Sequence, residues 1–162
     1  MEIVIQKHGD KITAYDDRTA KTYSIEELQN LAANGDSEAQ NAMGSYFFEL
    51  KNIDEAMAWY KKAAENGNAD AQWKLGGSYF AGAFGVKKDL EKAESWLRKS
   101  AEQGHAGGQC GLGGCYFAKN DWVNAKHWLE KSVAQGPANK NYAEAKHMLE
   151  AVMMFLKADY KP

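Results

Sequence analysis

The sequence predicts an all-α protein built from repeated pairs of helices, and two observations support this fold class. First, a glycine preceded by Asn or Gln recurs along the 162-residue chain at intervals of 32, 37 and 32 residues. Second, the same residue types follow the first three of these glycines in a fixed order: a glutamine, a second glycine and an aromatic residue. Repeats of about this length are typical of stacked helical arrays. The four punctuating glycines are Gly35, Gly67, Gly104 and Gly136.

Each unit divides into two helices. In the first helix an apolar residue precedes the aromatic residue by one helical turn, as Leu75 precedes Tyr79, so both lie on one face. In the second helix an alanine and a tryptophan share a face in the same way. We expect these tryptophans to be largely buried between successive units: Trp59, Trp96 and Trp128. First helices are expected at 37–50, 69–81 and 105–119, and second helices at 53–66, 89–103 and 122–135.

Charge and glycine mark where these helices begin and end. Asp54 and Glu55 open one second helix and Lys62 lies near its end, an order that complements the helix dipole. The recurring Asn-Gly or Gln-Gly pair closes a helix, because glycine readily takes the left-handed backbone conformation. The segment from Ser24 to Glu27 has the sequence of a capping box and predicts a further helix that ends at Asn34.

The two ends of the chain differ from the repeats. Apolar alternation around Ile3–Ile5 and Ile12–Tyr15 predicts a β-hairpin with its turn at Gly9-Asp10, which must either pack on the first helix or be loose. Residues 142–160 predict a long closing helix. We therefore divide the chain into an N-terminal hairpin or extension, a capping half-repeat, three repeats and a C-terminal capping helix: residues 1–23, 24–36, 37–68, 69–105, 106–137 and 138–162.

Composition excludes several classes of function. The formal net charge of −2 gives no bulk basic charge for holding nucleic acid or an anionic membrane surface. No stretch approaches the length of apolar sequence that a membrane span needs. The N-terminus lacks a basic region followed by a long apolar one, so we expect no signal peptide and a cytoplasmic protein.

The stretch from Leu75 to Gly104, LGGSYFAGAFGVKKDLEKAESWLRKSAEQG, resembles the Sel1-like repeat, a relative of the tetratricopeptide repeat. It departs from the family pattern by one extra residue between Gly82 and Gly85, and the first and third units lack the Gly-x-Gly-Val loop altogether. The resemblance implies a right-handed α-solenoid with a concave groove. The family serves mainly as scaffolds and adaptors, so it implies a protein or peptide partner.

No residues form a recognisable catalytic, metal or cofactor site. The four histidines make no ligand pair with one another or with a cysteine, and we interpret them as solvated or partly packed: His8, His105, His127 and His147. Cys110 and Cys115 are five residues apart on one expected helix, so their side chains diverge and cannot form a disulfide. We expect two buried thiols, no enzyme activity and no cofactor.

The first helices are expected to line the groove. Each carries a second aromatic residue directly after the first, which either faces the groove or wedges between neighbouring first helices. Trp73 is the most informative residue because the sister units have Asn41 and Cys110 in its place. Glycines such as Gly107 and Gly114 predict a floor of small residues beneath it. The candidate partner-binding residues are Asn41, Phe48, Asp70, Trp73, Phe80, Cys110 and Phe117.

Three functions are compatible with this pattern. We favour a non-enzymatic module that binds a protein or peptide in its concave groove. A narrower alternative is a cytoplasmic immunity-type protein that neutralises a cognate toxin, and a third is an enzyme or small-molecule binder of unknown class.

The 82–88 insert, which carries Phe84, is expected to protrude and to contact a partner or fold back over its own unit. The pattern leaves the oligomeric state open.

Overall fold

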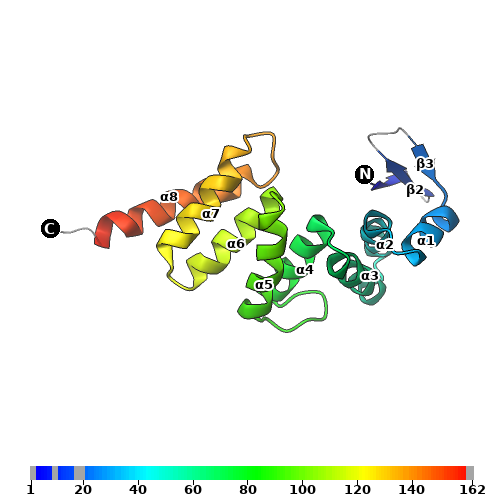
Figure 1. The fold of residues 1–162 in the computed structure, drawn as a ribbon, viewed down its shortest axis with the longest axis horizontal. Coiled ribbons are helices and arrows are strands. Elements are labelled where there is room, and N and C mark those ends of the chain that lie inside the picture. The colour runs from blue at the N-terminus through cyan, green and yellow to red at the C-terminus, as the bar shows by residue number, and fades with distance from the viewer. Residues whose placement is uncertain (1–2, 9–10, 17–20, 160–162) are drawn as a thin grey trace.

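The computed structural model describes residues 3–8, 11–16 and 21–159, which form an elongated helical array preceded by a small β-sheet (Figure 1). Every predicted helix is present, and its ends agree with the predicted ends to within one or two residues. The all-α solenoid fold is therefore confirmed. The elements in order are β1 Ile3–His8, β2 Lys11–Asp16, β3 Lys21–Tyr23, α1 Ile25–Ala33, α2 Ser37–Glu49, α3 Ile53–Glu65, α4 Ala69–Ala81, α5 Leu90–Glu102, α6 Ala106–Ala118, α7 Trp122–Ala134 and α8 Tyr142–Asp159.

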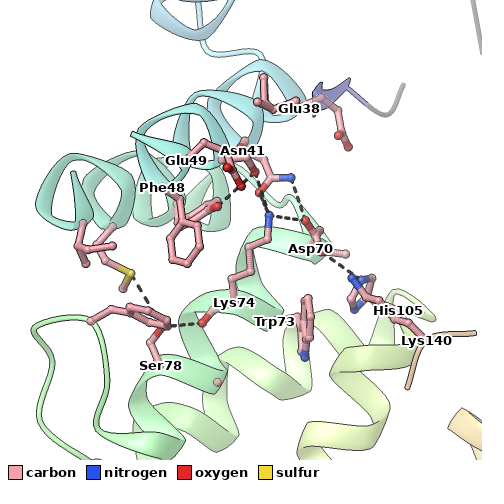
Figure 2. A pocket seen from close by; sticks show the side chains of 18 of the residues that line it. Glu38, Asn41, Phe48, Glu49, Asp70, Trp73, Lys74, Ser78, His105 and Lys140 are labelled. Carbon is pink, nitrogen blue, oxygen red and sulfur yellow. Dashed lines mark hydrogen bonds and ion pairs between the residues drawn. The ribbon is translucent and has the colours of Figure 1, made fainter. Parts of the chain in front are cut away.

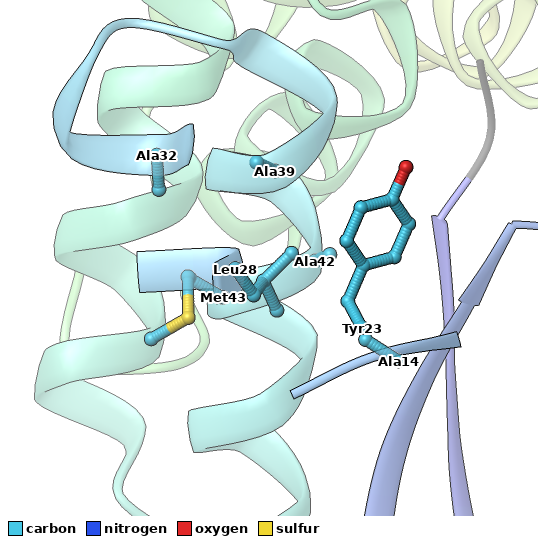
Figure 3. Packing of buried hydrophobic residues seen from close by; sticks show 7 residues of the cluster. All are labelled: Ala14, Tyr23, Leu28, Ala32, Ala39, Ala42 and Met43. Carbon is cyan, nitrogen blue, oxygen red and sulfur yellow. The ribbon is translucent and has the colours of Figure 1, made fainter. Parts of the chain in front are cut away.

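The N-terminal strands form and pack against the first helices. Strand β2 pairs antiparallel with both β1 and β3, placing Ala14 opposite Ile5 on one side and Tyr23 on the other. Ala14 and Tyr23 are buried against Leu28 of α1 and Met43 of α2 (Figure 3). The third strand was not predicted, because three residues are too few to show an alternating pattern. The predicted turn at Gly9-Asp10 lies outside the described residues.

Side-chain caps define the helix starts. The predicted capping box is present: Ser24 Oγ accepts from the Glu27 N–H at 3.1 Å, and Glu27 Oε2 accepts from the Ser24 N–H at 2.8 Å. At the ends of the second helices, positive φ angles of 89° at Gly67 and 83° at Gly104 confirm the left-handed closure. These tight turns join the second helix of one unit to the first helix of the next.

Within each unit the two helices approach closely at a glycine. A Cβ built on Gly76 of α4 would lie 2.6 Å from Leu97 Cγ of α5 and 3.1 Å from the Leu97 backbone nitrogen. Such distances leave no room for a side chain. The glycines of the other two units meet the equivalent residue at 2.5 and 2.6 Å; the pairs are Gly44 with Tyr60 and Gly113 with Leu129. The second glycine of the repeat is thus required by helix packing.

A buried glutamine ties each unit to the preceding one. Gln72 Nε2 donates to the Ala64 carbonyl oxygen of α3 at 3.0 Å, and Gln72 Oε1 accepts from Gln103 Nε2 at the end of α5 at 2.8 Å. Gln40 and Gln109 make the corresponding pairs of hydrogen bonds in the other units. These bonds give the helix-end carbonyls, which also accept from the N–H of the closing glycine, a second partner from the next unit.

The repeat tryptophans lie between units as predicted, but they are only partly buried. Trp96 packs against the cluster formed by α3 and α4, while the following residue, Leu97, is 1% exposed. The rings are not fully buried, because Leu97 points about 100° away into the unit's own core and leaves Trp96 at the margin of that core. A lysine three residues later lies over each ring, for example Lys99 with its Nζ 4.2 Å from the Trp96 centroid.

We expect Gly76→Ala to lower the free energy of unfolding by about 1–3 kcal/mol, because the new methyl group would overlap Leu97. The matched control is Gly77→Ala in the same helix, where a Cβ meets nothing within 4 Å. This control should raise stability by about 0.5–1 kcal/mol through helix propensity. Urea unfolding followed by circular dichroism measures both. Equal effects of the two substitutions would contradict the packing role of Gly76.

Candidate functional site

A pocket of about 1090 Å³ lies along the first helices of the first two units. Its walls come mainly from α2 and α4, with further side chains from α3. Ile5 of β1 borders it at one edge, and Ala138 and Lys140 of the loop before α8 border it at another. The non-repeat segments therefore help to enclose a cavity whose floor belongs to the repeats.

Asp70 of α4 is the centre of the polar part of the pocket (Figure 2). Its Oδ2 accepts a hydrogen bond from Asn41 Nδ2 of α2 at 3.0 Å and forms an ion pair with Lys74 Nζ at 2.8 Å. Its Oδ1 lies 3.6 Å from His105 Nε2. Three polar side chains from two different units and one inter-unit turn thus converge on one carboxylate.

The carboxyl of Asp70 remains ionised in this setting. Burial favours its neutral form, but the nearby His105 ring and the interactions with Lys74 and Asn41 outweigh burial and hold the pKa of Asp70 well below its ordinary value. The negative charge of Asp70 is therefore matched locally by Lys74.

The Lys74 ammonium group is held by several partners within the pocket. Besides the ion pair, its Nζ donates to Asn41 Oδ1 at 3.2 Å and to Ser45 Oγ at 3.3 Å. The same Nζ lies 4.5 Å from the ring centroid of Tyr60, whose hydroxyl donates to Ser45 Oγ at 3.2 Å. Lys74 was not among the predicted site residues. Its counterparts in the sister units are the small residues Ala42 and Gly111. A lysine at this repeat position therefore departs from the pattern and could have been recognised as a candidate site residue.

His105 is also a pocket residue that sequence reasoning missed. Its Nδ1 accepts from the Gly108 N–H at 3.1 Å and so caps the start of α6. In the neutral ring the proton then lies on Nε2, the nitrogen that faces Asp70. The counterparts of His105 are Asp36 and Asn68, both ordinary N-cap residues, so a histidine at this register position could have been recognised.

Trp73 lines the pocket and also wedges between units. A Cβ on Gly107 would lie 2.8 Å from Trp73 Cε2, so the indole covers this glycine of α6. The Trp73 ring centroid is 5.5 Å from that of His105, and Lys140 Nζ lies 4.5 Å from the Trp73 centroid. The predicted open floor of small residues is wrong: Trp73 covers Gly107, and Met148 of α8 lies over Gly114.

Four of the seven predicted residues line this pocket together: Asn41, Phe48, Asp70 and Trp73. The other three do not reach it. Phe80 packs against the cluster of α5 and α6. Cys110 is 2% exposed in a cluster shared with α8. The ring centroid of Phe117 lies 5.2 Å from that of Trp122 and 6.1 Å from that of Phe155 in α8. Helix α8 therefore covers the face of the third unit that the pattern assigned to the groove.

Both cysteines are buried free thiols, as expected. Burial raises the pKa of Cys110 to about 12 and the pKa of Cys115 to about 11. Neither thiol is therefore activated as a nucleophile near neutral pH.

Within the described ranges, no three His, Cys, Asp or Glu side chains gather as ligands for a metal ion. The same part of the chain holds no helix long and apolar enough to cross a membrane.

The stacked helix pairs, the buried inter-unit glutamines and the pocket on the first helices define a tetratricopeptide-like helical repeat protein. The family model for Sel1 repeats matches residues 37–68, 69–105 and 119–137. The chain belongs to the Sel1 repeat family, whose members are generally interaction scaffolds without enzyme activity. No curated protein matches the chain.

Solved structures agree with this assignment. A Sel1 repeat protein from Oxalobacter formigenes is 36% identical with a TM-score of 0.67, over 78% of this chain and 97% of that one. A protective antigen of uropathogenic Escherichia coli with an SLR fold is 38% identical with a TM-score of 0.61, over 70% of this chain and 26% of that one. The first tetratricopeptide repeat domain of Spaghetti, bound to an HSP90 peptide, is 21% identical with a TM-score of 0.58, over 75% of this chain and 95% of that one, and shares the fold.

We expect Asp70→Asn to lower the free energy of unfolding at pH 7 by roughly 1–2 kcal/mol, because it removes the charge that holds Lys74 and Asn41. Since the folded pKa of Asp70 is lowered, its contribution is fully present above the unfolded pKa and declines as pH falls from about 5. The difference between wild type and variant should therefore shrink below about pH 4.

Urea midpoints measured between pH 3 and pH 8 provide this test. The control is Asp54→Asn, an exposed residue in the first turn of α3. A stability difference for Asp70→Asn that stays constant over this pH range would show that its charge has no role in the folded state.

Proposed function

We propose that this protein is a non-enzymatic interaction module that binds a segment of a protein partner in the pocket between its first two repeats. The observation that carries this proposal is the pocket itself, which combines partly exposed aromatic rings with polar groups held in fixed positions. At about 1090 Å³ it is at the upper end of the size of small-molecule sites and suits several residues of a polypeptide.

The candidate contacts are Asn41, Phe48, Asp70 and Trp73, to which the geometry adds Lys74. Asn41, Asp70 and Lys74 are held by one another in the free protein. Binding of a partner therefore costs little side-chain conformational entropy at these positions, which favours affinity. Trp73 and Phe48 supply the apolar area that dominates most interface hot spots.

The pocket offers little for catalysis. His105 accepts a hydrogen bond at one ring nitrogen and directs the other toward Asp70, so neither is disposed to act on a bound substrate. Neither the family match nor the relatives favour the immunity-type alternative. The interaction function is therefore the one we carry forward.

Photo-crosslinking tests the proposal. A photoreactive amino acid at Lys140, an exposed residue on the pocket rim, should capture a partner protein from a lysate of the source cells. The matched control is the same amino acid at Val123, which is 70% exposed and does not line the pocket. A product formed at Lys140 and absent at Val123 is the expected result. No product at Lys140, or the same products at both positions, would contradict partner binding in this pocket.

A further inference from the structure

The insert between α4 and α5 brings an aromatic residue of the second unit against the part of the pocket wall that belongs to the first unit. Phe84 stands where this chain has one residue more than the family pattern, and the other units have no counterpart. Its ring lines the pocket, with its centroid 5.6 Å from that of Phe48 in α2 at an interplanar angle of 76°. The loop thus folds back over the preceding unit.

The backbone at this position is unfavourable for a bulky residue. The Val86 N–H donates to the Ala83 carbonyl oxygen at 3.2 Å, closing a four-residue turn. Its two central residues have positive φ angles, 54° at Phe84 and 81° at Gly85. Turns with two positive φ angles favour Gly, Asn and Asp, so phenylalanine is strained here. Unfavourable conformations of this kind persist where the surroundings impose them and gather at functional sites.

The loop is anchored at both ends. The Ala83 N–H donates to the Ser78 carbonyl oxygen at 3.0 Å, and the Asp89 N–H donates to the Tyr79 carbonyl oxygen at 2.9 Å. Although the backbone is held, the Phe84 side chain remains 45% exposed. A strained and half-exposed aromatic ring is costly to stability on both counts, and its contact with Phe48 offsets only part of that cost.

The pocket has an ion pair in its middle, an acidic residue on one side of the pair and a basic residue on the other. Asp70 and Lys74 neutralise each other in the middle. Phe48 and Glu49 lie on one side of this pair and Trp73 and Lys140 on the other (Figure 2). Glu49 forms no ion pair within the described part of the chain. Two apolar side chains of α3, Ile53 and Met57, also line the pocket, and Met57 packs against the same cluster as Phe48.

We propose that Phe48 and Phe84 form a preformed anchor subsite for one aromatic or large aliphatic side chain of an extended partner segment, with a basic neighbour placed at Glu49. The inference rests on the proposed function and specifies its partner chemistry. The apolar rings supply the surface for the anchor, and Glu49 supplies the complementary charge for lysine or arginine. The insert makes Phe84 the residue that distinguishes this pocket from that of a chain with the shorter loop.

A random twelve-residue peptide library displayed on phage tests the subsite directly. Peptides selected on the wild-type protein should share an aromatic or large aliphatic residue beside Lys or Arg. Replacing that anchor residue by alanine should weaken binding by about tenfold or more in a fluorescence anisotropy titration.

The decisive variant is Phe84→Gly, because glycine accepts the positive φ angle without strain. This variant should weaken the selected peptides by about tenfold or more, while its urea midpoint stays equal to or above that of wild type. Glu49→Lys should weaken the peptides that carry a basic neighbour. The control is Met154→Ala, which removes a side chain that is 67% exposed and outside the pocket, and should leave binding unchanged.

Two results would overturn the subsite and leave the proposed function standing. One is a selected peptide that blocks the Lys140 crosslink but has no apolar anchor. The other is a selected peptide that binds Phe84→Gly as tightly as it binds the wild-type protein. If no displayed peptide competes for the pocket, the Lys140 crosslink is repeated in the Phe84→Gly background. A reduced yield of the partner product supports the subsite, and an unchanged yield overturns it. Absence of any Lys140-specific product removes the proposed function and this inference together.

Discussion

The close approach of the two helices within each unit is the constraint on which the rest of the structure depends. It requires a glycine on the first helix at the point where the second helix presents the large side chain that follows the repeat tryptophan, as Leu97 is presented to Gly76. The contacts to the preceding unit lie close to this point along the chain. Gln72, one turn before Gly76, donates to the Ala64 carbonyl oxygen, and Trp96, next to Leu97, packs against the cluster of α3 and α4.

Repetition explains why the sequence was so informative about the fold. A glutamine or glycine that meets the same neighbour in every unit recurs at the same position, so the pattern could be read without any contact being known. Trp96 shows the limit of this reading: recurrence located it between units but could not say that Leu97 would take the fully buried place. The third strand had no repeat to support it and was missed.

The pocket was only partly predictable because it combines departures from the repeat with segments outside it. Trp73 was identified because it stands out from its counterparts, and Asp70 because it lies one turn before Trp73 on the same face of the helix. His105 was missed because a histidine that caps a helix looks like an isolated histidine in the sequence. Phe117 was assigned to the groove because nothing in the repeats reveals that α8 lies across the third unit. Long-range docking of a closing helix is a tertiary property that local spacing does not encode.

The bridge from Asn41 to Asp70 and Lys74 has a mechanical consequence. The curvature of a helical solenoid depends on the small rotation between successive units, so a change in that rotation bends the array. This polar bridge spans the gap between α2 and α4 on the pocket side, where bending would open or close the array. It therefore connects the two helices that form the main walls of the pocket. A change in curvature would therefore reach the proposed binding pocket first through these three side chains.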